Sequence, residues 1–276
     1  MSLWVRYQHA DGRVGFGTLQ GDRIAEYEGN LFGDCAARGS SVAREAVALL
    51  APCAPTKIVA LWNNFHALGA KLGKKAPAHP LFLIKPASSV AASGEPILRP
   101  RAYRGKIAFE GELAIVIGRY CKEVSVAAAE DFVFGYTCIN DVTAAEVLNE
   151  DENFAQWTRA KGYDTFACLG PAIATDFAWS EAHVMTHVDG VQRQNYPLSD
   201  MIFSPAEQVS LISHDMPLFP GDVIACGTSL GVGSMKDGAT VEVSIDGIGT
   251  LANVLSPAAR DERPSENRHA VAADRG

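Results

Sequence analysis

The pattern of apolar and polar positions divides the chain into many short extended segments. In the first 55 residues, two alternating segments flank Asp11-Gly12, which predicts a hairpin. Pro52 and Pro55 then mark a soft boundary. We therefore expect a small N-terminal β/α domain over residues 1–55. Its predicted elements are strands at Leu3–His9, Val14–Leu19 and Arg23–Tyr27 and a helix at Ser41–Leu50.

Residues 56–256 continue as one β-rich unit. Short runs of β-branched and apolar residues predict nine strands, at Lys57–Leu61, Leu81–Lys85, Glu110–Gly118, Phe132–Asn140, Leu169–Ile173, Val184–Val188, Val223–Gly227, Ala239–Ile245 and Gly249–Val254. Helical spacing is found at Val126–Glu130, Val142–Asn149 and Pro205–Ser213. Val188-Asp189-Gly190-Val191 predicts a tight hairpin. The expected fold is mainly β with peripheral helices (α+β), followed by a disordered tail at residues 257–276.

Composition and charge narrow the class of protein. The chain has 276 residues and a formal net charge of -8, which argues against nucleic acid or an anionic membrane as a partner. No apolar run approaches ~20 residues, and the N-terminus lacks a signal-peptide pattern. The six cysteines are scattered without a C-x-x-C pair, which is typical of free thiols in a reducing cytosol. We therefore expect a cytoplasmic protein.

The first candidate for chemistry is Glu110-Gly111-Glu112, at the start of a buried apolar run. Residues i and i+2 of a strand share one face, about 6.6 Å apart at ~3.3 Å per residue. Two like charges at the mouth of a buried element need a cation or protons to neutralise them. The alternative is an ordinary solvated strand end.

Asp141 supplies a third carboxylate, at the end of another predicted strand. It is either the N-cap of a following helix or a metal ligand. Three carboxylates suit Mg²⁺ or Mn²⁺, which keep water in positions that a bidentate substrate can take. A glycine-rich segment, Gly227–Gly233, could cradle an anion or could be a simple turn.

Several motifs together resemble the fumarylacetoacetate hydrolase family from about residue 56 to residue 256. The motifs are Trp62-Asn63-Asn64-Phe65-His66, Phe82-Leu83-Ile84-Lys85, Phe109-Glu110-Gly111-Glu112-Leu113, Gly135-Tyr136-Thr137 through Asn140-Asp141, Lys161-Gly162-Tyr163-Asp164-Thr165-Phe166, and Gly221-Asp222-Val223-Ile224 through Gly227-Thr228. The resemblance implies a mixed β-sandwich roll and, usually, a homodimer. It also implies Mg²⁺ or Mn²⁺, with Ca²⁺ as an alternative, bound by Glu110, Glu112 and Asp141. Its substrates are small 2-oxo acids and acylpyruvates.

The chemistry of such substrates assigns expected roles to further residues. A water that attacks a carbonyl needs a base with a pKa near neutrality, and His66 is the candidate. Lys161 is the candidate for stabilising an oxyanion or a substrate carboxylate. Lys85 and Thr228 are the expected substrate-binding residues.

Two departures from the family pattern affect the substrate side. Many members carry His-x-x-Glu, whereas Gly69 stands at the Glu position here. Many also carry an Arg and a Gln in the segment after the Asp, whereas Ala145 and Leu148 stand at those positions here. Arg104, Arg159 or Lys85 are candidates to replace the missing Arg. We expect a substrate with a less polar tail than fumarylacetoacetate.

The leading hypothesis is a metal-dependent hydrolase that cleaves a C–C bond in an acylpyruvate-like 2,4-dioxo acid, in the catabolism of aromatic compounds. The alternative on the same site is a 2-oxo acid decarboxylase, or an isomerase or hydratase of a 2-oxo-dienoate, which the missing Glu favours. A catalytically silent binding protein is a third hypothesis. It would have to retain three mutually repelling carboxylates without a metal.

Overall fold

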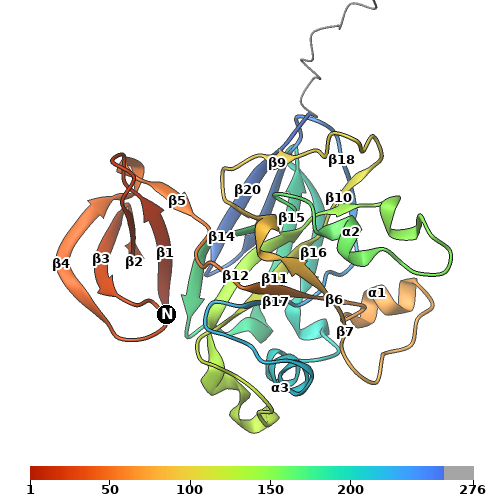
Figure 1. Cartoon of the computed structure of the whole chain (residues 1–276), viewed down its shortest axis with the longest axis horizontal. Helices are drawn as coiled ribbons and strands as arrows, with labels where there is room; N and C mark the ends of the chain where they lie inside the picture. The colour runs from red at the N-terminus through yellow and green to blue at the C-terminus, as the bar shows by residue number, and fades with distance from the viewer. Residues whose placement is uncertain (258–276) are drawn as a thin grey trace, which may run out of the picture.

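The computed structural model describes residues 1–257, which form three β-sheets with short helices at their rims (Figure 1). This arrangement confirms the predicted mainly β fold with peripheral helices. The predicted tail at residues 257–276 lies outside the described residues, apart from Pro257.

The largest sheet has twelve strands and supports the candidate site. Its strands, in spatial order, are β4 (Cys35–Ala43), β3 (Arg23–Gly29), β2 (Val14–Gln20), β1 (Ser2–Gln8), β14 (Ala167–Thr175), β12 (Val133–Asp141), β11 (Gly111–Ile117), β17 (Val223–Ala225), β6 (Lys57–Trp62) and β7 (Leu81–Pro86). Two short strands join this path from the side, β5 (Ala48–Leu50) on β1 and β8 (Val90–Ala92) on β14.

Two smaller sheets complete the β structure. A five-stranded sheet has the order β16 (Val191–Pro197), β15 (His183–Val188), β19 (Thr240–Ile245), β20 (Gly249–Ser256) and β9 (Ile97–Leu98). A three-stranded sheet has the order β13 (Thr143–Ala144), β10 (Ile107–Phe109) and β18 (Gly233–Met235). The hairpin of β15 and β16 closes at Asp189-Gly190, where both residues have positive φ, as the sequence predicts.

Helices are short and lie at the edges of the sheets. The α-helices are α1 (His66–Lys71), α2 (Trp157–Lys161) and α3 (Pro205–Asp215), and the 3₁₀ turns are η1 (Arg44–Ala46), η2 (Ala87–Ser89), η3 (Val126–Phe132), η4 (Val147–Asn149), η5 (Trp179–Glu181) and η6 (Leu198–Asp200). The predicted helix at residues 205–213 is present as α3, which begins with a capping box between Ser204 and Glu207. Within residues 1–257, no helix has the length and apolar character that crossing a membrane requires.

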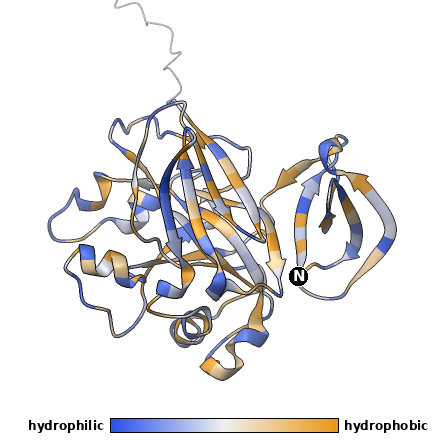
Figure 2. Ribbon diagram, turned by 180° about the vertical axis from the view of Figure 1, so that it is seen from behind, coloured by the Kyte–Doolittle hydropathy of each residue, from blue (hydrophilic) through white to orange (hydrophobic). Residues whose placement is uncertain are grey.

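Strand β11 lies at the centre of the part of the fold formed by residues 57–256 and is buried along its whole length. Its odd-numbered residues Leu113, Ile115 and Ile117 join the core cluster that includes the five-stranded sheet, while Ala114 and Val116 join a second cluster on the opposite face. This two-sided burial explains the continuous apolar run after Glu112. Hydrophobic residues recur along the strands where the sheets meet (Figure 2).

The N-terminal strands extend the main sheet. Strand β1 pairs antiparallel with β14, with Ser2 opposite Thr175 and Trp4 opposite Ile173. Val5, Tyr7 and Ile24 form a separate small core there with Ala172 of β14. The N-terminal part therefore has a core of its own, and the pairing of β1 with β14 also joins it to the rest of the main sheet (Figure 1).

The predicted helix at Ser41–Leu50 is wrong. This segment contains the end of β4, the turn η1 and strand β5. Ile24 pairs with Val42, and Tyr7 pairs with Leu49, so neighbouring strands take the backbone groups that a helix would have used. Tertiary pairing outweighs the helical spacing of the sequence.

The predicted helix at Val142–Asn149 is also wrong, because the segment forms β13 and the short turn η4. The N–H group of Val142 donates to the carbonyl oxygen of Phe166, and the N–H group of Ala145 donates to that of Lys106. These long-range partners replace the bonds of a helix. Asp141 is consequently the last residue of β12 and caps no helix.

Candidate metal centre

Three carboxylates gather at one end of the two central strands. Strand β11 begins where the antiparallel β12 ends, and the N–H group of Asp141 donates to the carbonyl oxygen of Glu110 at 2.8 Å. Glu112 pairs with Ile139, two residues before Asp141, so these side chains share a face. One oxygen atom from each of Glu110, Glu112 and Asp141 lies within 4.8 Å of the others. This distance is compatible with a single ion between them.

Glu112 has a feature that distinguishes a metal site from a structural ion pair. Its side chain is fully buried; Oε2 accepts a hydrogen bond from the N–H group of Gly227 at 2.9 Å, while Oε1 has no partner among the described residues. Burial, and then repulsion by Asp141 and Glu110, raises the pKa of Glu112 well above its ordinary value. A divalent cation would satisfy the free oxygen and offset the repulsion, so the donor set fits Mg²⁺ or Mn²⁺.

Lys161, the last residue of α2, lies between two of the carboxylates. Its Nζ donates to Glu110 Oε1 at 2.9 Å and to Asp141 Oδ2 at 2.6 Å, and only 3% of the side chain is exposed. Burial alone would lower the pKa of Lys161, but attraction by Asp141 and the two glutamates outweighs it and raises the pKa. Lys161 is therefore a permanent cation with one N–H proton that is not used by these two bonds.

Lys85 reaches the same cluster from β7, on its closed side. It is fully buried, and its Nζ donates to Asp141 Oδ1, to the carbonyl oxygen of Phe166 at 2.8 Å and to that of Val142 at 3.3 Å. These bonds use all three protons of the ammonium group. The placement does not support the expected contact of Lys85 with substrate, and it makes Lys85 a support of Asp141.

The two lysines fix the charge state of Asp141. Burial by itself would raise the pKa of Asp141, but attraction by Lys161 and Lys85 outweighs it and lowers the pKa. Two ammonium groups thus face three carboxylates, which leaves an excess of one negative charge when all three are ionised. Burial first, and this excess of negative charge second, raise the pKa of Glu112, the carboxylate with the fewest donors.

Thr228 lies beside the cluster, next to the Gly227 that binds Glu112. Its Oγ1 donates to the carbonyl oxygen of Gly111 at 3.1 Å and accepts a hydrogen bond from Nε2 of Gln194 at 2.8 Å. The side chain is almost buried. The structure therefore places Thr228 close to the carboxylates, while its role in binding substrate stays a prediction.

His66 is exposed and begins α1. Among the described residues no hydrogen bond to its ring is found. The segment before it is fixed, since the N–H group of Ala67 donates to Asp200 Oδ2 at 3.0 Å and Phe65 forms a β-bridge with Met201. Its role as a base stays a prediction.

The position of the missing family glutamate has little free space. Gly69 is buried, and a Cβ atom there would lie 3.1 Å from Oδ1 of Asn63. Asn63 itself has a φ of 57°. A larger residue at position 69 would therefore require the Asn63 side chain to move by a few tenths of an ångström.

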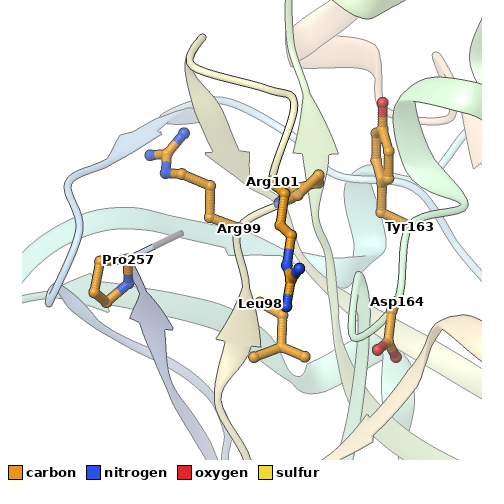
Figure 3. A pocket seen from close by; sticks show the side chains of 7 residues that line it. Leu98, Arg99, Arg101, Tyr163, Asp164 and Pro257 are labelled. Atoms are coloured by element: carbon orange, nitrogen blue, oxygen red, sulfur yellow. The ribbon is translucent and has the colours of Figure 1, made fainter. Parts of the chain in front are cut away.

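Of the three cations proposed to replace the missing family arginine, Lys85 lies in the cluster and bonds Asp141, whereas the two arginines are exposed. Arg159 is more than half exposed and pairs with Glu150 at 2.7 Å, and Arg104 is exposed. A cavity of about 320 Å³ is lined by Arg101 and by Tyr163 and Asp164, which come shortly after Lys161 in the sequence, among other residues (Figure 3). None of the three clustered carboxylates lines this cavity, so it is separate from the metal centre.

Sequence reasoning missed several residues that hold the ligands. Thr143 Oγ1 donates to Glu110 Oε1 at 2.8 Å, and Asn140 Oδ1 accepts the N–H group of Glu110 at 3.0 Å. Gln194 and Tyr196, from β16, bond to Gly111 between the two glutamates. The hairpin signal at Asp189-Gly190 could have revealed β16, but the sequence gives no sign of which strand it faces.

Comparison with known proteins agrees with the fold. The family model described as Fumarylacetoacetate (FAA) hydrolase C-terminal matches residues 57–256, and the model described as Rv2993c-like, N-terminal matches residues 3–52. Protein Rv2993c of Mycobacterium tuberculosis is 40% identical over 264 residues, covering 94% of this chain and 96% of that protein.

Solved structures extend this likeness over nearly the whole chain. The 2-hydroxyhepta-2,4-diene-1,7-dioate isomerase of Mycobacterium marinum is 38% identical, with a TM-score of 0.84, and the match covers 93% of this chain and 98% of that one. Maleylpyruvate hydrolase of Sphingobium sp. SYK-6, solved with manganese (II) ion and pyruvate, is 27% identical, with a TM-score of 0.75 and coverage of 94% and 100%. The chain belongs to the fumarylacetoacetate hydrolase family.

Proposed function

We propose that this protein is a divalent-metal-dependent enzyme that hydrolyses a carbon–carbon bond in an acylpyruvate-like 2,4-dioxo acid, in the catabolism of aromatic compounds. The observation that carries the proposal is the buried group of three carboxylates in which Oε1 of Glu112 has no partner among the described residues. A buried anionic oxygen without a donor is costly, and a metal ligand is the role that removes the cost.

Glu110, Glu112 and Asp141 would hold the ion, with Mg²⁺ or Mn²⁺ as the expected metal. When bound, such an ion supplies Lewis acidity that polarises the carbonyl group of a 2-oxo acid. The manganese in the related maleylpyruvate hydrolase supports this choice. Lys85 and Thr143 would keep Asp141 and Glu110 in place as ligands.

The charges of the site favour an anionic substrate. With all five groups ionised, the three carboxylates and two ammonium groups carry one net negative charge, and a divalent cation would change this to one positive charge. A substrate carboxylate would restore neutrality in a buried place where an unbalanced charge is costly. The charge balance therefore favours a 2-oxo acid over a neutral ketone as the substrate.

Two residues would act on the substrate itself. Lys161 has one N–H proton left and stays charged, so it can donate a hydrogen bond to an oxygen on which negative charge develops. His66 would take a proton from the attacking water, as the general base of the hydrolysis. Hydrolysis of an acylpyruvate by one water would release pyruvate and a carboxylic acid.

One observation favours a second candidate function, isomerisation of a 2-oxo-dienoate. Gly69 occupies the position of the family glutamate, so this chain has no carboxylate at that position to orient His66. An imidazole without such a partner is a weaker base for water. Isomerisation needs only the movement of a proton, and the related isomerase of Mycobacterium marinum performs its reaction on the same fold.

Product analysis tests the proposal. The purified protein with Mn²⁺ is incubated with an acylpyruvate, and products are separated by chromatography. Pyruvate together with the matching acid supports hydrolysis; an isomerised dienoate from a 2-oxo-dienoate supports the second candidate; release of CO₂ would indicate decarboxylation. No turnover of any 2-oxo acid, by a protein that binds Mn²⁺, would contradict both candidates.

We also propose a cytoplasmic homodimer, as the family resemblance and the scattered thiols imply. Light scattering of the purified protein would test the oligomeric state, and a mass of a single 29.4 kDa chain would contradict it.

A further inference from the structure

The peptide between the two metal-binding glutamates lies where a strand partner is missing. On one edge, β11 pairs with β17 only over Ala114–Val116, and the last backbone bond runs from Cys226 N–H to the carbonyl oxygen of Leu113. Every second residue of β11 directs its backbone N–H and C=O groups toward this edge, so Gly111 is the next residue after Leu113 that does so. Its buried N–H and C=O groups would be unpaired if only backbone partners were available.

Side chains from β16 and from the loop after β17 take the place of that missing strand. Gln194 Oε1 accepts the N–H group of Gly111 at 3.0 Å. Tyr196 OH donates to the carbonyl oxygen of Gly111 at 2.6 Å, and Thr228 Oγ1 donates to the same oxygen at 3.1 Å. Gln194 and Tyr196 are 1% and 4% exposed, so water does not compete for these bonds.

The absence of a side chain at Gly111 makes this arrangement possible. A Cβ atom at this position would lie 2.1 Å from Thr186 Oγ1 and 3.2 Å from both methyl groups of Val243. The five-stranded sheet therefore approaches the backbone of β11 directly at Gly111. This close approach explains why a glycine separates the two glutamates.

The amide of Gln194 has a second end, which reaches the glycine-rich loop. Its Nε2 donates to Thr228 Oγ1 at 2.8 Å and to the carbonyl oxygen of Leu230 at 3.3 Å. The same loop binds Glu112 through Gly227 N–H. One side chain thus connects the Glu110–Glu112 peptide with the loop that carries Thr228.

We propose that Gln194 is a positioning residue that sets the spacing of Glu110 and Glu112 for the metal and ties it to the position of Thr228 on the substrate side. The inference rests on the proposed metal site. Loss of the amide leaves the buried N–H group of Gly111 without an acceptor and frees the loop. Metal affinity and substrate binding should then weaken together, as they do when groups that orient metal ligands are removed.

Gln194→Met tests this, because methionine has a similar volume and no amide. The matched control is Gln192→Met, which changes an exposed glutamine of the same strand. Mn²⁺ affinity is measured by the electron paramagnetic resonance signal of free and bound Mn²⁺, without substrate. Gln194→Met should weaken the affinity about tenfold or more and change the spectrum of bound Mn²⁺, whereas Gln192→Met should match the wild type.

Tyr196→Phe is a second variant that keeps the fold if Gln194→Met does not, since Thr228 still donates to Gly111. It should weaken Mn²⁺ binding by a smaller factor than Gln194→Met. The proposal would be overturned if Gln194→Met bound Mn²⁺ with wild-type affinity and spectrum. If Gln194→Met is unfolded, the same result in Tyr196→Phe would overturn it. A lower melting temperature of the metal-free protein with unchanged Mn²⁺ binding would show a merely structural role and overturn it as well.

The substrate readout separates this inference from the proposed reaction. If the wild type turns over a 2-oxo acid, Gln194→Met should raise KM more than Gln192→Met does. If the wild type binds Mn²⁺ but turns over no 2-oxo acid, the proposed function fails. The Mn²⁺ measurements then still decide the role of Gln194.

Discussion

Two buried carboxylates flank β17, and they differ in how their oxygens are satisfied. Asp222, just before β17, accepts hydrogen bonds from the N–H groups of Thr56, Lys57 and Phe219, from Thr56 Oγ1 and from the Lys57 ammonium group. Glu112, beside the other end of β17, has one donor, and its second oxygen has none among the described residues.

Asp222 and Glu112 are therefore equally buried but have different roles. Neither carboxylate side chain has exposed surface. The donors around Asp222 complete its shell within the protein, which is what a carboxylate that stabilises a turn needs. The incomplete shell of Glu112, beside two further carboxylates, is instead suited to an ion supplied from outside. Buried oxygens without partners are thus a better guide to function than burial or charge alone.

The largest expected effect is that of Glu112→Gln. Turnover should fall about 10³-fold or more, because a ligand of the ion that stabilises charge in the transition state is lost. The metal-free protein should become more stable by about 1 kcal/mol, since a buried glutamine avoids the cost of placing a third carboxyl group beside Asp141 and Glu110. Steady-state kinetics and urea unfolding in EDTA measure the two effects. Unchanged turnover would remove Glu112 from the metal site.

His66→Ala should lower hydrolysis about 10²-fold, the usual contribution of a general base. The ring makes no hydrogen bond within the described residues, so Mn²⁺ affinity and melting temperature should stay at wild-type values. This variant would therefore differ from changes at Glu112 and at Asp222, because it should lower the rate without changing metal affinity or stability. Hydrolysis at the original rate would mean that another group activates the water.

Asp222→Asn is the counterpart of Glu112→Gln and should show the opposite pattern. Breaking the buried pair with Lys57 should lower the free energy of unfolding by about 3 kcal/mol. Mn²⁺ affinity of the folded protein should not change. Urea unfolding and a Mn²⁺ titration measure these quantities. A large loss of Mn²⁺ affinity with little loss of stability would reverse the roles assigned to the two carboxylates.

The smallest effect concerns pH. Burial would raise the pKa of Asp222, but hydrogen bonds from Lys57 and Thr56 outweigh it and hold the pKa below its usual value of 3.8. A lowered pKa in the folded state contributes stability that is present above pH 3.8 and is lost as the pH falls through the folded-state pKa. The stability difference between wild type and Asp222→Asn should therefore be constant from about pH 5 to 7 and shrink below pH 3.8. A difference that grows in acid would contradict this account.

The sequence predicted features that depend on neighbouring residues. Glu110 and Glu112 share a face because strand periodicity requires it, and Asp141 joins them because β11 and β12 are antiparallel neighbours. The same reasoning failed at Ser41–Leu50 and Val142–Asn149, where distant partners such as Phe166 outweigh local helical spacing.

The supports of the site could not be predicted for the same reason. Gln194 contacts Gly111 across 83 residues of sequence, and Lys85 contacts Asp141 across 56. A sequence shows that Lys85 and Lys161 are cations, but only the structure shows that Lys85 has used its three protons and Lys161 has one left. That difference follows from the packing of α2 and β7 around the cluster.

The most direct test is anomalous diffraction from a Mn²⁺-soaked crystal of the wild-type protein. The account predicts one manganese peak between Glu110, Glu112 and Asp141, with Oε1 of Glu112 about 2.1 Å from the ion. A manganese peak elsewhere, or Oε1 of Glu112 still without a partner in the soaked crystal, would contradict it.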